Sequence, residues 1–306
     1  MRRSISSTAA IRAIRFRRAM AVLASCLIWS CGATVAAAQP ENAEISARRA
    51  SERTAFSDEE IKDGFVKTAL GAELQFGRAD KRIRKFDGPV RVFVAGGEAP
   101  QARASIAKVV EDIQGRVEHL DVAITDDRQA ANVVVTLVRK NELAATLRAR
   151  YGAAKARQIQ QKLNPECLSG VGVDKEFHIK RAEVFLPVDA GEFRLFDCAY
   201  EELLQVLGVV NDDRSVPWTM FNDDVQMGFF DVYDQHLVNI LYDPRVQPGM
   251  TRSEVEGVMP EVLPAVRKWV AGVNPEKLVK ADDKLDQRFD AACYCDVPDR
   301  DVASLR

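Results

Sequence analysis

Five side chains able to bind a cation or to move a proton lie within twelve residues of the chain: Glu201, Glu202, Gln205, Asn211 and Asp212. On a helix, residues four apart point the same way, so Glu201 and Gln205 can share one ligand while Glu202 is turned aside by one step. Carboxylate and amide oxygens bind hard cations, and a carboxylate can serve as a general base. The segment therefore predicts a ligand-binding cleft, with Glu202 as the catalytic residue if the protein has any activity.

The helix expected to carry these residues runs from about residue 193 to residue 207. A helical projection gives it a broad apolar face and leaves its acids on the opposite face. Gly208 is suited to end the helix and redirect the chain, which would let Asn211 or Asp212 return towards Glu201. The same pattern is typical of an ordinary amphipathic helix whose acids face water, and both interpretations stay open.

The rest of the chain alternates helical and strand patterns. Helices are predicted over 58–70, 102–114, 141–162 and 231–241, and strands over 89–94, 120–125, 132–138 and 182–188. Residues 167–170 are expected to form a loop, and Pro187 favours an edge position for the last strand. A capping box at Ser253 begins a segment that Pro260 and Pro264 interrupt. This order predicts an α+β domain, in which helices pack a mixed β-sheet and the C-terminal part is mainly helical.

Four segments are expected along the chain: a signal peptide at 1–38, a flexible lead-in at 39–56, the main domain at 57–272 and a C-terminal tail at 273–306. Arginines precede an apolar run and small residues end at Ala38, which predicts cleavage there and a periplasmic or secreted protein. Lipoprotein anchoring through Cys26 is the alternative. Elsewhere no stretch has the roughly 18 apolar residues of a membrane span, so no transmembrane segment is expected in the mature chain.

The net charge of the mature chain bears on the class of partner that it can bind. Residues 1–38 contain six of the 43 Lys and Arg, which leaves 37 against 45 Asp and Glu, a net charge of −8. The short basic run at 81–85 is expected to be a solvated loop or strand edge, so no nucleic-acid partner is predicted.

Of three pairings open to the four remaining cysteines, we favour a disulfide between Cys167 and Cys198. The pairing of Cys293 and Cys295 stays open.

The segment around the five polar residues resembles the metzincin signature of zinc proteases, HExxHxxGxxH followed by Asp. Its counterpart here reads Glu201-Glu202-x-x-Gln205-x-x-Gly208-x-x-Asn211-Asp212. Met220 lies about where the Met-turn of that group would be, so the resemblance gives Gly208 and Met220 structural roles. The run from Cys198 to Met250 is more closely similar to exported bacterial proteins of the domain-of-unknown-function 2927 family. The resemblance implies a zincin-like fold for residues 57–272 and brings no settled activity.

The departures from the protease pattern decide what chemistry is expected. Glu201, Gln205 and Asn211 stand where the pattern has zinc-binding imidazoles. An all-oxygen set is a poor zinc site and leans towards calcium, magnesium or manganese, so no zinc is expected, and an oxygen-ligated divalent cation is the alternative. Without a Lewis acid, water beside Glu202 keeps a pKa far above neutral.

These considerations favour a non-catalytic binding module, a degenerate metalloprotease of the cell envelope that holds a peptide or an envelope component in its cleft. The alternatives are a hydrolase that uses Glu202 with an altered metal site, and a structural protein without a ligand. His119, His178 and His236 share no ligand spacing. His178 precedes the strand that would border a zincin cleft, and His236 is expected to pack inside the domain.

Overall fold

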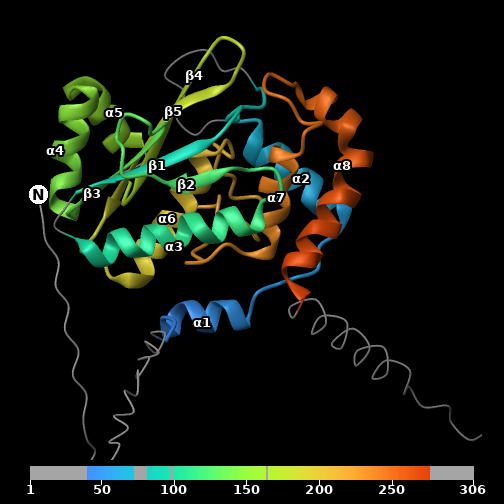
Figure 1. Cartoon of the computed structure of the whole chain (residues 1–306), viewed down its shortest axis with the longest axis horizontal. Helices are drawn as coiled ribbons and strands as arrows, with labels where there is room; N and C mark the ends of the chain where they lie inside the picture. Colours follow the sequence, from blue (N-terminus) through green and yellow to red (C-terminus); the bar gives the residue numbers. More distant parts are fainter. Residues whose placement is uncertain (1–39, 72–80, 97–98, 163–164, 276–306) are drawn as a thin grey trace, which may run out of the picture. The chain divides into compact units, whose positions relative to one another are not determined.

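The computed structural model describes residues 40–71, 81–96, 99–162 and 165–275 (Figure 1). The chain divides after Pro40, and the described residues after it form one compact unit. The predicted signal peptide with Cys26, the pair Cys293 and Cys295, and nearly all of the predicted tail lie outside the described residues. Within the described part of the chain, no helix is both long and apolar enough to cross a membrane.

A five-stranded mixed sheet forms the centre of the unit. Its strands are β1 (Val90–Ala95), β2 (Val122–Ile124), β3 (Val133–Val138), β4 (Leu168–Val173) and β5 (Ile179–Pro187). They lie in the order β2-β1-β3-β5-β4, all parallel except β4, which is antiparallel to β5. The predicted mixed sheet is therefore confirmed.

Eight helices are present among the described residues. They are α1 (Ala43–Ala50), α2 (Asp58–Ala69), α3 (Pro100–Arg116), α4 (Lys140–Tyr151), α5 (Ala153–Lys162), α6 (Glu192–Val206), α7 (Val232–Tyr242) and α8 (Arg252–Val273). In α2, which was predicted over 58–70, a capping box is formed by Ser57 and Glu60. The described chain after β5 contains helices and no strand, so the α+β class is confirmed.

The two faces of the sheet are covered by different helices. Val184 and Leu186 of β5 belong to the main core with α3 and α6, whereas Phe185 between them belongs to a smaller cluster with Leu143 and Leu147 of α4. Because side chains of a strand alternate between faces, the hairpin of α4 and α5 covers the face opposite α6. Burial of each such aliphatic side chain stabilises the fold by roughly 1.5–3 kcal/mol.

Two predicted helical segments differ from the structure. The helix expected over 141–162 is two helices, because Gly152 has a φ of +83° that ends α4. The segment after Thr251 is one continuous helix, α8, which passes through Pro260 and Pro264 and begins with a capping box of Thr251 and Glu254 rather than at Ser253. Buried side chains along α8 outweigh the hydrogen bonds that the prolines remove.

The N-terminal lead-in was expected to have no regular structure, but the structure has α1 there. Its one buried side chain is Ile45, which explains why apolar periodicity gave no signal. Asn42 caps the helix, and Glu41 and Glu44 form ion pairs with Arg49 and Arg48. Local capping and charge pairs therefore support a helix that hydrophobic patterning does not reveal.

The strand predictions also need correction. The expected loop at 167–170 contains the start of β4, and β5 lies between β3 and β4 instead of at an edge. Pro187 is tolerated because it is the last residue of its strand. In the basic run at 81–85, Ile83, Arg84 and Lys85 are buried rather than solvated. The Nζ of Lys85 donates to the carbonyls of Leu241 and Asp243 at 3.0 and 3.3 Å, beside the C-terminus of α7.

Candidate functional site

The predicted disulfide between Cys167 and Cys198 is present in the structure. It joins the residue before β4 to the middle of α6, with a Cα–Cα distance of 5.9 Å. In the chain-entropy model, a link between residues 31 positions apart stabilises the folded state by about 3.5 kcal/mol. The bond therefore fixes the edge strand of the sheet beside the helix that carries the candidate residues.

Gln205 connects the same strand to the turn that follows α6. Its Nε2 donates to Oδ1 of Asp212 at 2.9 Å, and its Oε1 accepts a hydrogen bond from Oγ of Ser169 at 3.3 Å. Gln205 is buried, at 9% exposure. Gln205 stands where the protease pattern has a zinc-binding histidine. Both polar atoms of its side-chain amide form internal hydrogen bonds instead.

Asn211 is directed to α2 and not to Gln205. Its Nδ2 donates to the carbonyl of Lys67 at 2.9 Å, and its backbone N–H donates to the carbonyl of Thr68 at 3.1 Å. These carbonyls belong to the last turn of α2, where they have no partner within the helix. The structure therefore brings Gln205 and Asp212 together and gives the amide of Asn211 a capping role elsewhere.

Gly208 and Met220 are both held by close backbone contacts. Gly208 has a φ of +127°, and a Cβ there would lie 2.0 Å from the carbonyl oxygen of Arg84. The N–H of Met220 donates to Oδ2 of Asp234 at 2.8 Å, and the hydroxyl of Thr219 donates to the other oxygen of that carboxylate. Asp234 in α7 thereby fixes the turn at Met220, whose side chain is buried.

The acidic residues of α6 differ in their surroundings. Burial raises the pKa of Glu201 well above its usual range, and the neighbouring charges of Glu202, Asp212, Asp197 and Asp223 raise this pKa further. Glu202 is buried at 5% exposure, so substrate access to it is restricted. The concentration of acids around Glu201 favours a positively charged group beside it and disfavours an anion.

Asp197 and Ser169 were not among the predicted residues, although both shape the site. Oδ1 of Asp197 accepts from the N–H groups of Met227 and Gly228 at 2.8 and 3.2 Å, and Oδ2 pairs with Arg194. The spacing of four between Asp197 and Glu201 was the available sequence signal. Ser169 could not be found in the same way, because β4 itself was not predicted.

The histidines lie away from the five candidate residues. Within the described residues, the His, Cys, Asp and Glu side chains close enough together to hold one ion are Asp174, Glu176 and His178, at the turn between β4 and β5. Lys180 pairs with Asp174 there. His236 is buried, as predicted, and its Nδ1 lies 2.7 Å from the carbonyl of Val232. The donor set on α6 does not fit zinc, because Asn211 is turned away and the other donors are oxygens.

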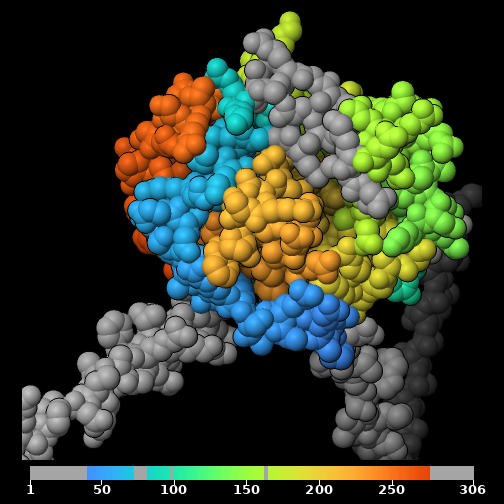
Figure 2. All heavy atoms as spheres, turned by 180° about the vertical axis from the view of Figure 1, so that it is seen from behind, coloured from blue at the N-terminus to red at the C-terminus, as the bar shows by residue number. Residues whose placement is uncertain are grey.

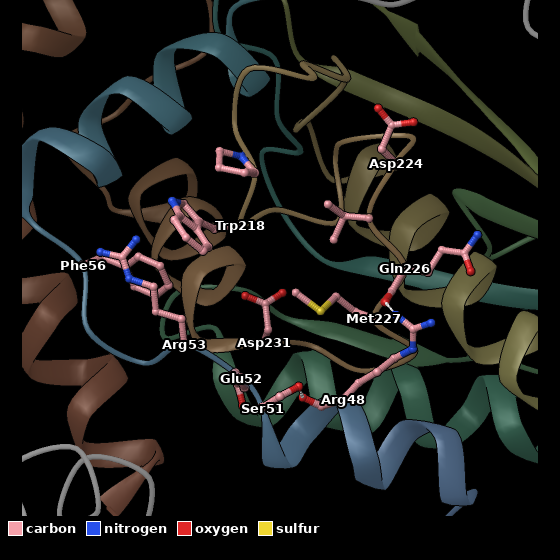
Figure 3. Close-up of a pocket in the computed structure, with 12 residues that line it drawn as sticks. Arg48, Ser51, Glu52, Arg53, Phe56, Trp218, Asp224, Gln226, Met227 and Asp231 are labelled. Atoms are coloured by element: carbon pink, nitrogen blue, oxygen red, sulfur yellow. Dashed lines mark hydrogen bonds between the residues drawn. The ribbon is translucent and has the colours of Figure 1, made fainter. Parts of the chain in front are cut away.

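A cavity of about 310 Å³ lies between the segment at 48–56 and the segment at 217–231 (Figure 3). Its charged lining residues are paired in part: Arg53 pairs with Glu60, Arg48 donates to the carbonyl of Gln226, and Oδ1 of Asp231 caps α7. Among the described residues, Oδ2 of Asp231 and Nε of Arg48 are buried without a hydrogen-bond partner. Figure 3 places the Asp231 carboxylate between the wall formed by Arg53 and Trp218 and the side chain of Met227. The cavity does not include any of the predicted site residues.

A family model described as "Protein of unknown function (DUF2927)" matches residues 58–261, which include all of the candidate residues on and after α6. No curated protein matches the chain.

Proposed function

The chain belongs to the DUF2927 family of proteins of unknown function, and we propose that it is an exported, non-catalytic, zincin-like module that binds an extended peptide of the cell envelope. A zincin-like fold is supported by the mixed sheet, by α6 following β5, and by the fixed turn at Met220. The observation that carries the proposal is the double hydrogen bond of Gln205 to Ser169 and Asp212. Gln205, which stands where the protease pattern has a zinc ligand, here holds β4 in place through Ser169.

The edge strand β4 provides the surface for a peptide. In the described sheet β4 pairs with β5 on one side and has no strand on the other. An extended peptide can add to such an edge through main-chain hydrogen bonds. The disulfide and the Ser169 contact position β4 rigidly, which lowers the entropic cost of binding.

The acids around Glu201 provide selectivity. A Lys or Arg side chain of the peptide would be attracted by the acids around Glu201, such as Asp212 and Asp223. Since the same acids repel carboxylates, acidic peptides are excluded. The module therefore selects extended peptides with a basic residue.

The test is a binding titration of the purified protein with labelled extended peptides that differ in one Lys-to-Glu exchange. We expect the basic peptide to bind roughly ten-fold more tightly. Asp212→Asn keeps an acceptor for Gln205 and should weaken binding of the basic peptide, while the exposed control Asp126→Asn should not. Equal binding of both peptides would contradict the proposed selectivity.

A hydrolase is the second candidate function, and the raised pKa of Glu201 beside Glu202 favours it. A carboxyl group with a raised pKa can act as a general acid beside a second carboxyl group. Peptidase and glycosidase assays with Glu202→Gln, together with metal analysis, distinguish the two functions. Turnover lost in Glu202→Gln, or stoichiometric metal lost in Gln205→Ala, would exclude the non-catalytic module.

A further inference from the structure

The hairpin of α4 and α5 carries a concentrated positive charge. Residues 139–162 contain seven Lys and Arg and one acid, Glu142. Of the 37 Lys and Arg and 45 Asp and Glu after residue 38, this leaves 30 against 44 for the remainder. A segment of charge +6 is thus attached to a remainder of charge −14. The net charge of −8 for the chain after residue 38 does not reveal this unequal distribution.

The basic side chains lie on the outer side of the hairpin. Leu143 and Leu147 of α4 and Ile159 of α5 are buried against the sheet in the smaller apolar cluster. The exposed basic residues are Arg139, Lys140, Arg148, Arg150 and Arg157. In Figure 2 the green atoms of this hairpin form the right-hand edge of the molecule's visible face. The charges are therefore presented on the side of the molecule where the hairpin covers the sheet face opposite α6.

Part of this charge is not neutralised within the fold. Lys140 pairs with Glu166, and Arg150 pairs with Glu183. Arg148 and Arg157 form no ion pair with the described residues, and both are exposed. Two guanidinium groups on neighbouring helices are thus available to an external anion, and arginine binds phosphate groups in a bidentate manner.

We propose that the hairpin of α4 and α5 docks the protein on a planar anionic surface, namely a bilayer that contains anionic phospholipid. A planar surface meets one end of the molecule, so it attracts the hairpin and repels the acidic remainder, which orients the protein. A long nucleic acid would extend past the hairpin along the acidic remainder and lose this advantage. The polarity of charge therefore fits a bilayer better than a nucleic acid.

The experiment is sedimentation of the protein with vesicles, using the chain that begins at Gln39. This chain contains every described element and lacks the arginines of residues 1–38, which would bind anionic vesicles themselves. Vesicles of phosphatidylcholine alone are compared with vesicles that also contain phosphatidylglycerol. We expect binding to the anionic vesicles, weakening as salt is added, and none to the neutral vesicles.

Charge-reversal variants locate the surface. The double variant Arg148→Glu/Arg157→Glu should lower the partition coefficient roughly 25-fold or more, since each basic residue near an anionic bilayer contributes about five-fold. Lys108→Glu/Lys268→Glu, at exposed positions of α3 and α8, makes the same change in net charge and should lower it far less. Circular dichroism establishes that each variant is folded.

Three results would overturn the proposal: equal loss in the two double variants, equal binding to neutral vesicles, or binding of duplex DNA with no binding of anionic vesicles. Arg148→Lys/Arg157→Lys adds a positive control, because attraction to an anionic bilayer surface depends on charge, so this variant should keep most of the binding. Peptide binding at β4 remains measurable in each variant, so failure of the docking surface is distinguishable from failure of the proposed peptide site.

Discussion

The Nε2 of Gln205 lies 2.9 Å from Oδ1 of Asp212, seven residues further along the chain. This contact closes the turn at the end of α6 and leaves Oε1 of Gln205 free to accept from Ser169 on β4. A helix, a turn and an edge strand are therefore joined through one buried amide. An imidazole that bound a metal at this position could not make both contacts in the same way.

Replacement of Gln205 by alanine should destabilise the protein by about 2 kcal/mol, because it removes two hydrogen bonds of a buried side chain. Urea unfolding followed by circular dichroism measures the change. Ser169→Ala, which removes one of the two contacts, should cost about 1 kcal/mol. If Gln205→Ala unfolds at the same urea concentration as the parent protein, the bridging role is wrong.

The disulfide gives a second prediction. The double variant Cys167→Ala/Cys198→Ala should lose about 3.5 kcal/mol of stability, because the unfolded chain regains the freedom of a loop of 31 residues. Each single variant should lose a similar amount, and Cys293→Ala serves as the control in oxidised protein. Peptide mapping without reduction should recover Cys167 joined to Cys198. A free thiol at Cys167 in the native protein would contradict the structure.

Local signals predicted much of the fold correctly. The capping box of α2 and the amphipathic pattern of α6 were sufficient for those helices, because capping and periodicity act within a few residues. β4 was missed because its sequence, Leu-Ser-Gly-Val-Gly-Val, has two glycines, and it forms a strand through pairing with β5. In α8, tertiary burial of residues such as Val262 overrides the prolines.

The candidate site could be predicted only in part, because some of its contacts are local and others join residues far apart in the sequence. A turn at Gly208 that returns Asp212 to α6 follows from helix-ending chemistry, so proximity of Asp212 to Gln205 could be anticipated. The direction of Asn211 could not, because its partners are carbonyls of Lys67 and Thr68 more than 140 positions away. The burial of Lys85 depends likewise on the distant end of α7.

His236 makes stability depend on pH. Burial lowers the pKa of His236 from 6.5 to about 4. Between these pH values the unfolded chain binds a proton that the folded protein does not, so stability is lost as pH falls from 6.5 to 4, by up to about 3 kcal/mol. His236→Asn keeps an N–H for the carbonyl of Val232 and cannot titrate. The difference in unfolding free energy between pH 7 and pH 4 should shrink by that amount in the variant, and an unchanged difference would assign the acid sensitivity to other groups.

Gly208 and Gly257 form a matched pair for testing how α6 ends. In Gly208→Ala the new Cβ would lie 2.0 Å from the carbonyl oxygen of Arg84, at a φ of +127° that alanine disfavours. We expect a loss of about 3 kcal/mol or more, since the contact is with backbone and cannot yield easily. Gly257 lies exposed within α8 with nothing within 4 Å of a Cβ, so Gly257→Ala should stabilise the protein by about 0.5–1 kcal/mol. Urea unfolding of both variants measures the contrast, and equal small effects would mean that the backbone at Gly208 is not held as closely as the structure shows.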